Sequence, residues 1–101
     1  TLLLTYSMIK SFSCEQTEMI WLGNKSRRFP SEIQNTARRK LRMINNSFSI
    51  NDLRVATSNR LEKLKGNLKG YYSLRVHDKY RIIFKWKSSN AHEVKIIDYH
   101  G

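Results

Sequence analysis

The chain has 101 residues, of which 40% are hydrophobic and 11% are aromatic, which is enough apolar material for one folded core and excludes a disordered chain. Lys and Arg number 19 against 8 Asp and Glu, so the net charge is +11 at pH 7. This excess predicts a polyanionic partner, such as nucleic acid, a ribosome surface or an acidic protein. The single cysteine, Cys14, excludes an internal disulfide framework and a cysteine cluster for zinc, which favours a reducing cytoplasm.

The opening stretch, TLLLTYS at residues 1–7, is apolar. It has no basic leader and is too short for a signal sequence or a membrane span. We expect it to be a disordered or added leader, followed by a single domain over residues 8–101 with no membrane association.

Two helices are predicted in the first half of the chain. A short one over residues 14–22 follows an edge strand at 9–13. A longer one begins near Pro30, because proline in the first turn and Glu32 near the positive end of the dipole favour a helix start. It should end near residues 45–47, where asparagines favour a left-handed cap. Its apolar stripe, which we expect to pack on a sheet, is formed by Ile33, Ala37, Leu41 and Ile44.

Basic residues are predicted on the other sides of this helix: Arg38, Arg39, Lys40 and Arg42. Such a run is most simply a solvated face. The arginines among them are also candidates for contacts with the phosphate backbone of a ribosomal RNA. Both interpretations remain open on the sequence.

The pattern is less regular between this helix and residue 70. Residues 49–55 predict a single helical turn with Asp52 near its beginning, and residues 56–59 predict a loop. A basic segment over residues 60–67 then ends in a Gly-Asn turn.

Residues 70–86, GYYSLRVHDKYRIIFKW, predict a β-hairpin, because apolar and polar side chains alternate with a period of two. The apolar side chains of both strands share one buried face only if the loop has an odd number of residues, which makes 77–79 the loop and pairs Leu74 with Ile82. Arg75 is then directly opposite Arg81 on the other face. Like charges opposed across a ladder are destabilising, so this pair indicates an anion between them.

A last strand is predicted over residues 93–99, after a turn at 87–90. The predicted order is one strand, two helices, and then three or four strands. This order favours an α+β fold, in which a small antiparallel-rich sheet carries two N-terminal helices packed on one face.

The candidate chemistry is basic. No zinc-ligand spacing, phosphate-binding glycine loop or nucleophile elbow occurs, so we expect no metal and no cofactor. Metal-free cleavage of RNA needs a base for the 2′-hydroxyl, positive charge at the phosphate and an acid for the leaving oxygen. Arg75 and Arg81 match the second need, because guanidinium groups bind phosphate oxygens in a fork and stay charged. Lys65 and Lys63 could add to that charge.

The best candidates for proton transfer are at the C-terminal end. His100 titrates near neutral pH, and Tyr99 is a weaker candidate. On spacing alone, Tyr99 is as readily an aromatic packed on the sheet edge, and His100 a terminal residue without contacts. Asp98, among so many cations, should stay ionised and orient a neighbour rather than react.

The segment LEKLKGNLKGYYSLRVHDKYRIIFKW, with the opening MIKSF and the terminal IIDYH, resembles the host-inhibition-of-growth toxins (HigB, plasmid maintenance killer type) of the RelE superfamily. The resemblance runs from residue 8 to residue 100. It implies a cytoplasmic, metal-independent endoribonuclease that cleaves mRNA on the ribosome during translation and so inhibits growth. It also implies a helix-turn-helix antitoxin of the HigA type, through which the toxin–antitoxin complex binds operator DNA.

The positions that match the family's functional residues are Lys65 before the glycine turn, Arg81 in the Tyr-Arg strand, and Asp98, Tyr99 and His100 at the end. The family often has a histidine three residues before that lysine. Here the position is Glu62, which we consider as a substitute base.

Two other functions remain open on the sequence. One is a toxin of the same fold that inhibits DNA gyrase without cleaving RNA, which toxicity surviving the loss of both His100 and Tyr99 would favour. The other is a basic RNA- or DNA-binding module with no catalytic role, which salt-dependent binding without mRNA cleavage would favour.

Overall fold

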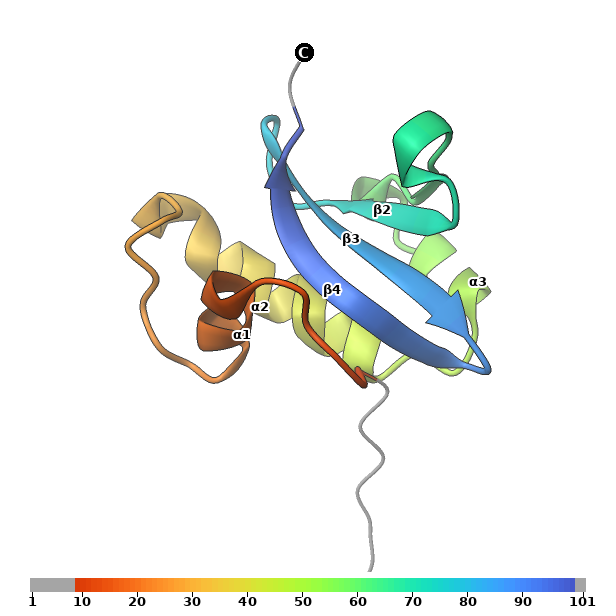
Figure 1. Cartoon of the computed structure of the whole chain (residues 1–101), viewed down its shortest axis with the longest axis horizontal. Helices are drawn as coiled ribbons and strands as arrows, with labels where there is room; N and C mark the ends of the chain where they lie inside the picture. The colour runs from red at the N-terminus through yellow and green to blue at the C-terminus, as the bar shows by residue number, and fades with distance from the viewer. Residues whose placement is uncertain (1–8, 100–101) are drawn as a thin grey trace, which may run out of the picture.

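The computed structural model describes residues 9–99 and has the predicted α+β architecture (Figure 1). Its four strands form one antiparallel sheet in the order β1-β2-β3-β4. The elements in chain order are α1 (Glu15–Trp21), α2 (Ser31–Asn45), α3 (Ile50–Arg54), the 3-10 turn η1 (Thr57–Asn59), β1 (Glu62–Lys63), the 3-10 turn η2 (Gly66–Leu68), β2 (Tyr71–Arg75), β3 (Tyr80–Lys87) and β4 (Asn90–Asp98). The expected leader at residues 1–7 lies outside the described residues.

Helices α1 and α2 pack on one face of the sheet, and Figure 1 shows α2 behind β4. The predicted apolar stripe of α2 is buried, and Ile20 of α1 joins it. Leu74, Ile82 and Phe84 of β2 and β3 meet these side chains from the sheet. Each such side chain stabilises the fold by about 1.5–3 kcal/mol when fully buried. The core therefore defines one covered face of the sheet.

Lys40 departs from the predicted basic face of α2. The expectation of a solvated side chain is wrong at this position, because Lys40 is only 4% exposed. Residues three or four apart on a helix share a face, and Lys40 is spaced in this way from Ala37 and Ile44. Its backbone position therefore belongs to the apolar stripe, and its ammonium must find a buried partner.

The segment predicted as an edge strand runs along the outer edge of β4. Ile9 and Phe12 form isolated parallel bridges with Ala91 and Val94. The backbone N–H of Ser13 donates to the carbonyl of Val94 at 3.1 Å. The segment thus lies where an edge strand was expected, although its pairing is limited to isolated bridges.

The β2–β3 hairpin has the predicted register. Leu74 pairs with Ile82 and Arg75 with Arg81, and the N–H of Val76 donates to the carbonyl of Tyr80 at 3.0 Å. The β3–β4 turn is tighter, because Ser88 and Ser89 have φ of 53° and 64°. Two left-handed residues in a two-residue loop match the twist of antiparallel strands. As a result β4 begins at Asn90, earlier than predicted.

Two further features of the fold bear on the predictions. The basic segment at 60–67 contains β1, a strand of two residues that the sequence pattern did not indicate. Within residues 9–99, no helix is long and apolar enough to cross a membrane.

Candidate active site

The two arginines predicted to face each other do so in the structure. Arg75 on β2 and Arg81 on β3 are direct partners in the ladder. Their neighbours Leu74 and Ile82 point into the core, so the arginines project from the other side, which we call the open face. Two guanidinium groups therefore lie on the side of the sheet away from α1 and α2.

Each guanidinium has its own local partner. Nη2 of Arg75 lies 2.5 Å from Oδ1 of Asp78 in the hairpin loop, in a largely exposed ion pair. Arg81 is only 7% exposed, and its Nη2 donates to the carbonyl oxygen of Arg60 at 2.5 Å. The Cζ atom of Arg81 is 5.0 Å from the centroid of the Tyr99 ring, within cation–π range. Nε of Arg81 is buried and has no hydrogen-bond partner within residues 9–99.

The carbonyl that receives Arg81 is presented by an unusual backbone conformation. Arg60 has φ 44° and ψ 54°, which is in the left-handed region that residues other than glycine rarely adopt. The preceding residue, Asn59, is fully buried and accepts a hydrogen bond from the ammonium of Lys40. Burial is the main cause of a lowered pKa for Lys40, and the charges of Arg39 and Arg75 lower it further. The buried pair on α2 and η1 therefore sets the position of the Arg60 carbonyl.

Glu62 and Tyr99 approach the arginines from the two opposite edges of the sheet, which are β1 and β4. Glu62 on β1 is paired with Ser73 on β2, one alternate position from Arg75, so Glu62 shares the open face. Tyr99 follows β4, and its N–H donates to the carbonyl of Lys79 at 2.5 Å. The two candidate proton carriers thus border one arginine-bearing surface.

Lys65 and Lys63 are at the far end of β2. Both line a hollow of about 540 Å³ with Tyr71 and Tyr72, inside the turn that joins β1 to β2. The Nζ atom of Lys63 lies 6.0 Å from the Tyr72 ring centroid. The N–H of Leu64 donates to the carbonyl of Tyr71 at 2.9 Å, so Lys65 follows the position opposite the start of β2, whereas Arg75 ends that strand four positions later. The structure therefore separates the lysines from the arginines along β2.

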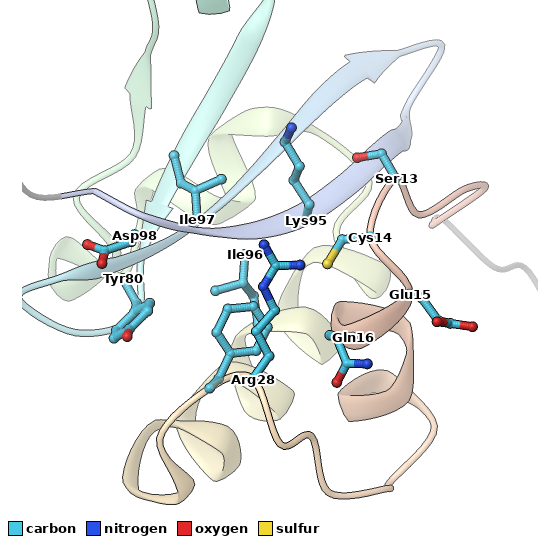
Figure 2. A pocket seen from close by; sticks show the side chains of 11 residues that line it. Ser13, Cys14, Glu15, Gln16, Arg28, Tyr80, Lys95, Ile96, Ile97 and Asp98 are labelled. Carbon is cyan, nitrogen blue, oxygen red and sulfur yellow. The ribbon is translucent and has the colours of Figure 1, made fainter.

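Asp98 lies on the other side of β4 from the arginines. It pairs with Tyr80, whereas Ile97 pairs with Arg81. Figure 2 shows Asp98 and Tyr80 at one end of a hollow of about 710 Å³. His100, expected to carry a proton, lies outside the described residues.

Cys14 and Arg28 line the same hollow as Asp98 (Figure 2). Burial raises the pKa of the Cys14 thiol, but hydrogen bonds from Thr17 and Gln16 and the charge of Arg28 outweigh burial and lower it. Cys14 is half-buried and forms no disulfide.

The three arginines of α2 differ in their contacts. Nε of Arg38 donates to the carbonyl of Ile20 at 2.8 Å, which ties α2 to α1. Arg39 and Arg42 are exposed. All three line a shallow surface hollow with Asn35 and Thr36. Arg38 is thus partly a structural residue, and the other two present their charge to solvent.

Sequence reasoning did not single out two buried polar residues near the arginine pair, Asn59 and Ser73. The hydroxyl of Ser73 is buried on the open face and has no hydrogen-bond partner within residues 9–99. Ser73 lies in the GYYSLRV run that carries the family resemblance but was given no role there, and Asn59 lies outside every motif, so the burial of both became evident only from the tertiary structure. In the part of the chain that the structure describes, no group of three or more His, Cys, Asp or Glu side chains is arranged to hold a metal ion.

Comparison with protein families identifies the chain. Residues 10–100 match the family model described as the RelE-like toxin of the type II toxin-antitoxin system HigB. The chain belongs to the HigB-like toxin family. It is 40% identical over 80 residues to Toxin HigB-1 of Vibrio cholerae, a match that covers 78% of this chain and 84% of that toxin. It is also 36% identical over 72 residues to an uncharacterized protein of Haemophilus influenzae, covering 71% of each.

A solved structure supports the same fold. The YoeB-YefM complex from Staphylococcus aureus contains a chain that superposes with a TM-score of 0.56 at 20% identity. The match covers 92% of this chain and 98% of that chain. This match shows a shared α+β fold, and the expected family is confirmed by the family model and the Vibrio cholerae relative.

Proposed function

We propose that this toxin is a metal-independent endoribonuclease that cleaves mRNA on the ribosome during translation and thereby arrests growth. The observation that carries the proposal is the direct opposition of Arg75 and Arg81 on the open face. A phosphodiester bound there would meet two permanent positive charges, and the charge that develops on its oxygens during cleavage would be stabilised.

Arg81 is the residue to which we assign the scissile phosphate. Its guanidinium is oriented by the Arg60 carbonyl and by the Tyr99 ring, and its buried Nε has no hydrogen-bond partner within residues 9–99. Orientation before the substrate arrives avoids a reorganisation cost during the reaction. The ion pair between Arg75 and Asp78 is exposed and therefore weak. When the substrate binds, Arg75 releases Asp78 and binds the same phosphate as Arg81.

The base and the acid come from the borders of this surface. Glu62 is an exposed carboxylate on the open face and takes the 2′-hydroxyl proton, unless His100 does so. His100 or Tyr99 donates to the leaving 5′-oxygen. Asp98 acts as a positioning residue at the end of β4. Lys65 and Lys63 do not contact the scissile phosphate and instead bind the RNA strand near the far end of β2. Ribosomal RNA is contacted by the arginines of α2, which are Arg38, Arg39 and Arg42.

The proposed partner is a helix-turn-helix antitoxin of the HigA type, acting in the cytoplasm. The family description places the relatives in type II toxin–antitoxin systems, and the structural neighbour is a toxin–antitoxin complex. The complex would bind operator DNA through the antitoxin.

The decisive experiment incubates the protein with ribosomes programmed with a defined mRNA and maps the new 5′ ends, beside a tube without ribosomes. Cleavage should need ribosomes, persist in EDTA-treated protein and disappear in Arg81→Ala. Lys25→Ala is the matched control, because it removes one exposed positive charge outside the site. Toxicity without cleavage would favour gyrase inhibition, and RNA binding without either would favour a non-catalytic module.

A further inference from the structure

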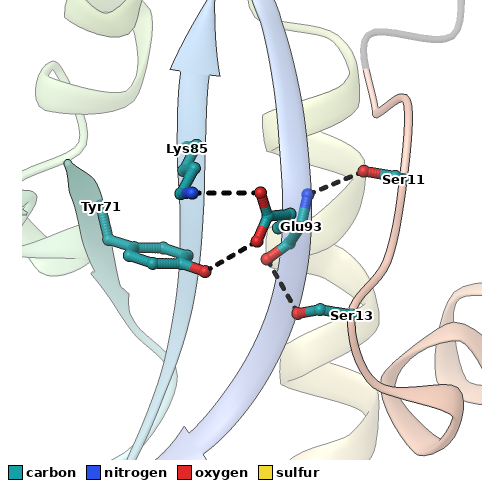
Figure 3. Close-up of polar contacts among 5 residues, drawn as sticks. All are labelled: Ser11, Ser13, Tyr71, Lys85 and Glu93. Carbon is teal, nitrogen blue, oxygen red and sulfur yellow. Dashed lines mark hydrogen bonds and ion pairs between the residues drawn. The ribbon is translucent and has the colours of Figure 1, made fainter. Parts of the chain in front are cut away.

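Glu93 interrupts β4 with a strained backbone. Its φ of 53° is in the left-handed region, and the β3–β4 ladder shifts register between Ile83 and Lys85 at this point. The hydroxyl of Ser11 accepts from the Glu93 N–H at 2.9 Å, and the hydroxyl of Ser13 donates to the Glu93 carbonyl at 3.1 Å (Figure 3). Strain that the surroundings hold in place in this way is typical of functional sites.

The bulge directs the Glu93 carboxylate onto the open face. It accepts a hydrogen bond from the Tyr71 hydroxyl at 3.1 Å and forms an ion pair with Nζ of Lys85 at 3.1 Å (Figure 3). Nζ of Lys85 also lies 5.2 Å from the centroid of the Tyr71 ring. The half-buried ring of Tyr71 is therefore held at its hydroxyl and beneath an ammonium.

The Tyr71 hydroxyl is not suited to act as a base. Burial raises its pKa, and the hydrogen bond to Glu93 raises it further. The other group of Tyr71 that can bind a ligand is its aromatic ring, which does not belong to the hydrophobic core.

Tyr71 also lines the hollow of about 540 Å³ inside the β1–β2 turn. The hollow is bordered by Leu64 and Tyr72 and by three lysines, Lys63, Lys65 and Lys69. Aromatic side chains beside ammonium groups are the combination that binds single-stranded nucleic acid, because bases stack on rings and phosphates pair with cations. Neutral apolar ligands would not use the lysines.

We propose that this hollow receives one nucleobase, stacked on Tyr71, with the phosphate of the same nucleotide on the loop lysines. The inference rests on the proposed function, since the strand would continue along the open face to Arg75 and Arg81. Tyr71 and Arg75 are four positions apart on β2, which is about 13 Å at the rise of a strand. The stacked nucleotide is therefore a neighbour of the scissile phosphate and belongs to the mRNA.

The test uses ribosomes programmed with an mRNA that carries 2-aminopurine near the cleavage point and a 2′-deoxy sugar at the scissile nucleotide. Stacking on Tyr71 should quench the fluorescence when wild-type protein binds. Tyr71→Phe keeps the ring and should keep the quenching, whereas Tyr71→Leu should abolish it and weaken binding about tenfold. Glu93→Ala, which removes both the hydrogen bond to Tyr71 and the ion pair of Lys85, should reduce quenching by a smaller factor. Lys25→Ala should match the wild type.

The outcomes separate this inference from the proposed function. Equal quenching by the Tyr71→Leu and Tyr71→Phe proteins overturns the stacking site, even if the wild type cleaves ordinary mRNA. Loss of quenching in folded Tyr71→Leu upholds it, even if the wild type cleaves nothing, because the deoxy substrate needs no cleavage. If instead Tyr71→Leu weakens binding to ribosomes without mRNA by the same factor, the base belongs to ribosomal RNA and the mRNA assignment is wrong. Should Tyr71→Leu not fold, loss of quenching in Tyr71→Phe, which keeps the ring, overturns the site.

Discussion

Nζ of Lys40 donates a hydrogen bond to Oδ1 of Asn59 in the interior of the protein. Nδ2 of Asn59 donates in turn to the carbonyl of Leu53 at 3.0 Å. Among the described residues no carboxylate pairs with Lys40. A buried ammonium held by an amide costs solvation energy, and here it ties α2 to the turn that presents the Arg60 carbonyl to Arg81.

Lys40→Met should lower the free energy of unfolding by about 1–3 kcal/mol, because Oδ1 of Asn59 is left buried without a donor. In an Asn59→Leu background the same change should cost less, since no amide oxygen remains to be satisfied. Urea unfolding of the four proteins measures both values. Lys25→Met, on an exposed loop, should stay within about 0.5 kcal/mol of the parent. Strictly additive effects of the two substitutions would refute the coupling.

The Lys40–Asn59 pair also predicts a pH dependence. The folded state lowers the pKa of Lys40 below its ordinary value of 10.5, so the unfolded chain binds more protons at this site. The stability cost of Lys40 is therefore present below the folded pKa and is relieved as the pH rises toward 10.5. As the pH is raised through this range, the free energy of unfolding should rise more steeply, or fall less, in the parent protein than in Lys40→Met. Parallel curves through this alkaline range would contradict the assignment.

The effect of substituting Arg60 on stability and cleavage should depend on the backbone preference of the new residue and not on the loss of charge. Arg60→Val and Arg60→Asn lose the same charge, but valine disfavours the observed φ of 44°, whereas asparagine tolerates it. We expect Arg60→Val to lose about 1–2 kcal/mol of stability and most of the ribosome-dependent cleavage, because the carbonyl would no longer meet Arg81. Arg60→Asn should keep most of both. Equal activity in the two variants would show that the carbonyl position does not matter.

Asp78→Asn should release Arg75 for substrate. The hydrogen bond and charge of Arg75 lower the pKa of the Asp78 carboxyl, so the ion pair is intact at neutral pH and competes with a bound phosphate. We expect the KM for programmed ribosomes to fall about twofold to fivefold, with kcat unchanged. Glu32→Gln on α2 makes the same change in net charge far from the hairpin. If KM falls equally in both variants, the effect comes from net charge at long range and not from the release of Arg75.

Local patterns were enough to determine the hairpin and its two arginines. Alternation with a period of two leaves one register that buries Leu74 with Ile82, and that register requires Arg75 to face Arg81. The same spacing rule explains the error at Lys40, which shares the stripe of Ala37 and was assigned to the solvated face by its charge alone. Such features depend on residues close together in the chain.

Only the tertiary structure decided the surroundings of these residues. The carbonyl bonded to Arg81 belongs to Arg60, and the hydroxyls that hold the Glu93 bulge belong to Ser11 and Ser13. These contacts join distant segments whose meeting depends on loop conformations that no periodic pattern encodes. The sequence by itself therefore determined the family, the register of the β2–β3 hairpin and its opposed arginines. The partners of these arginines, and the separation of Lys65 and Asp98 from them, arise from packing.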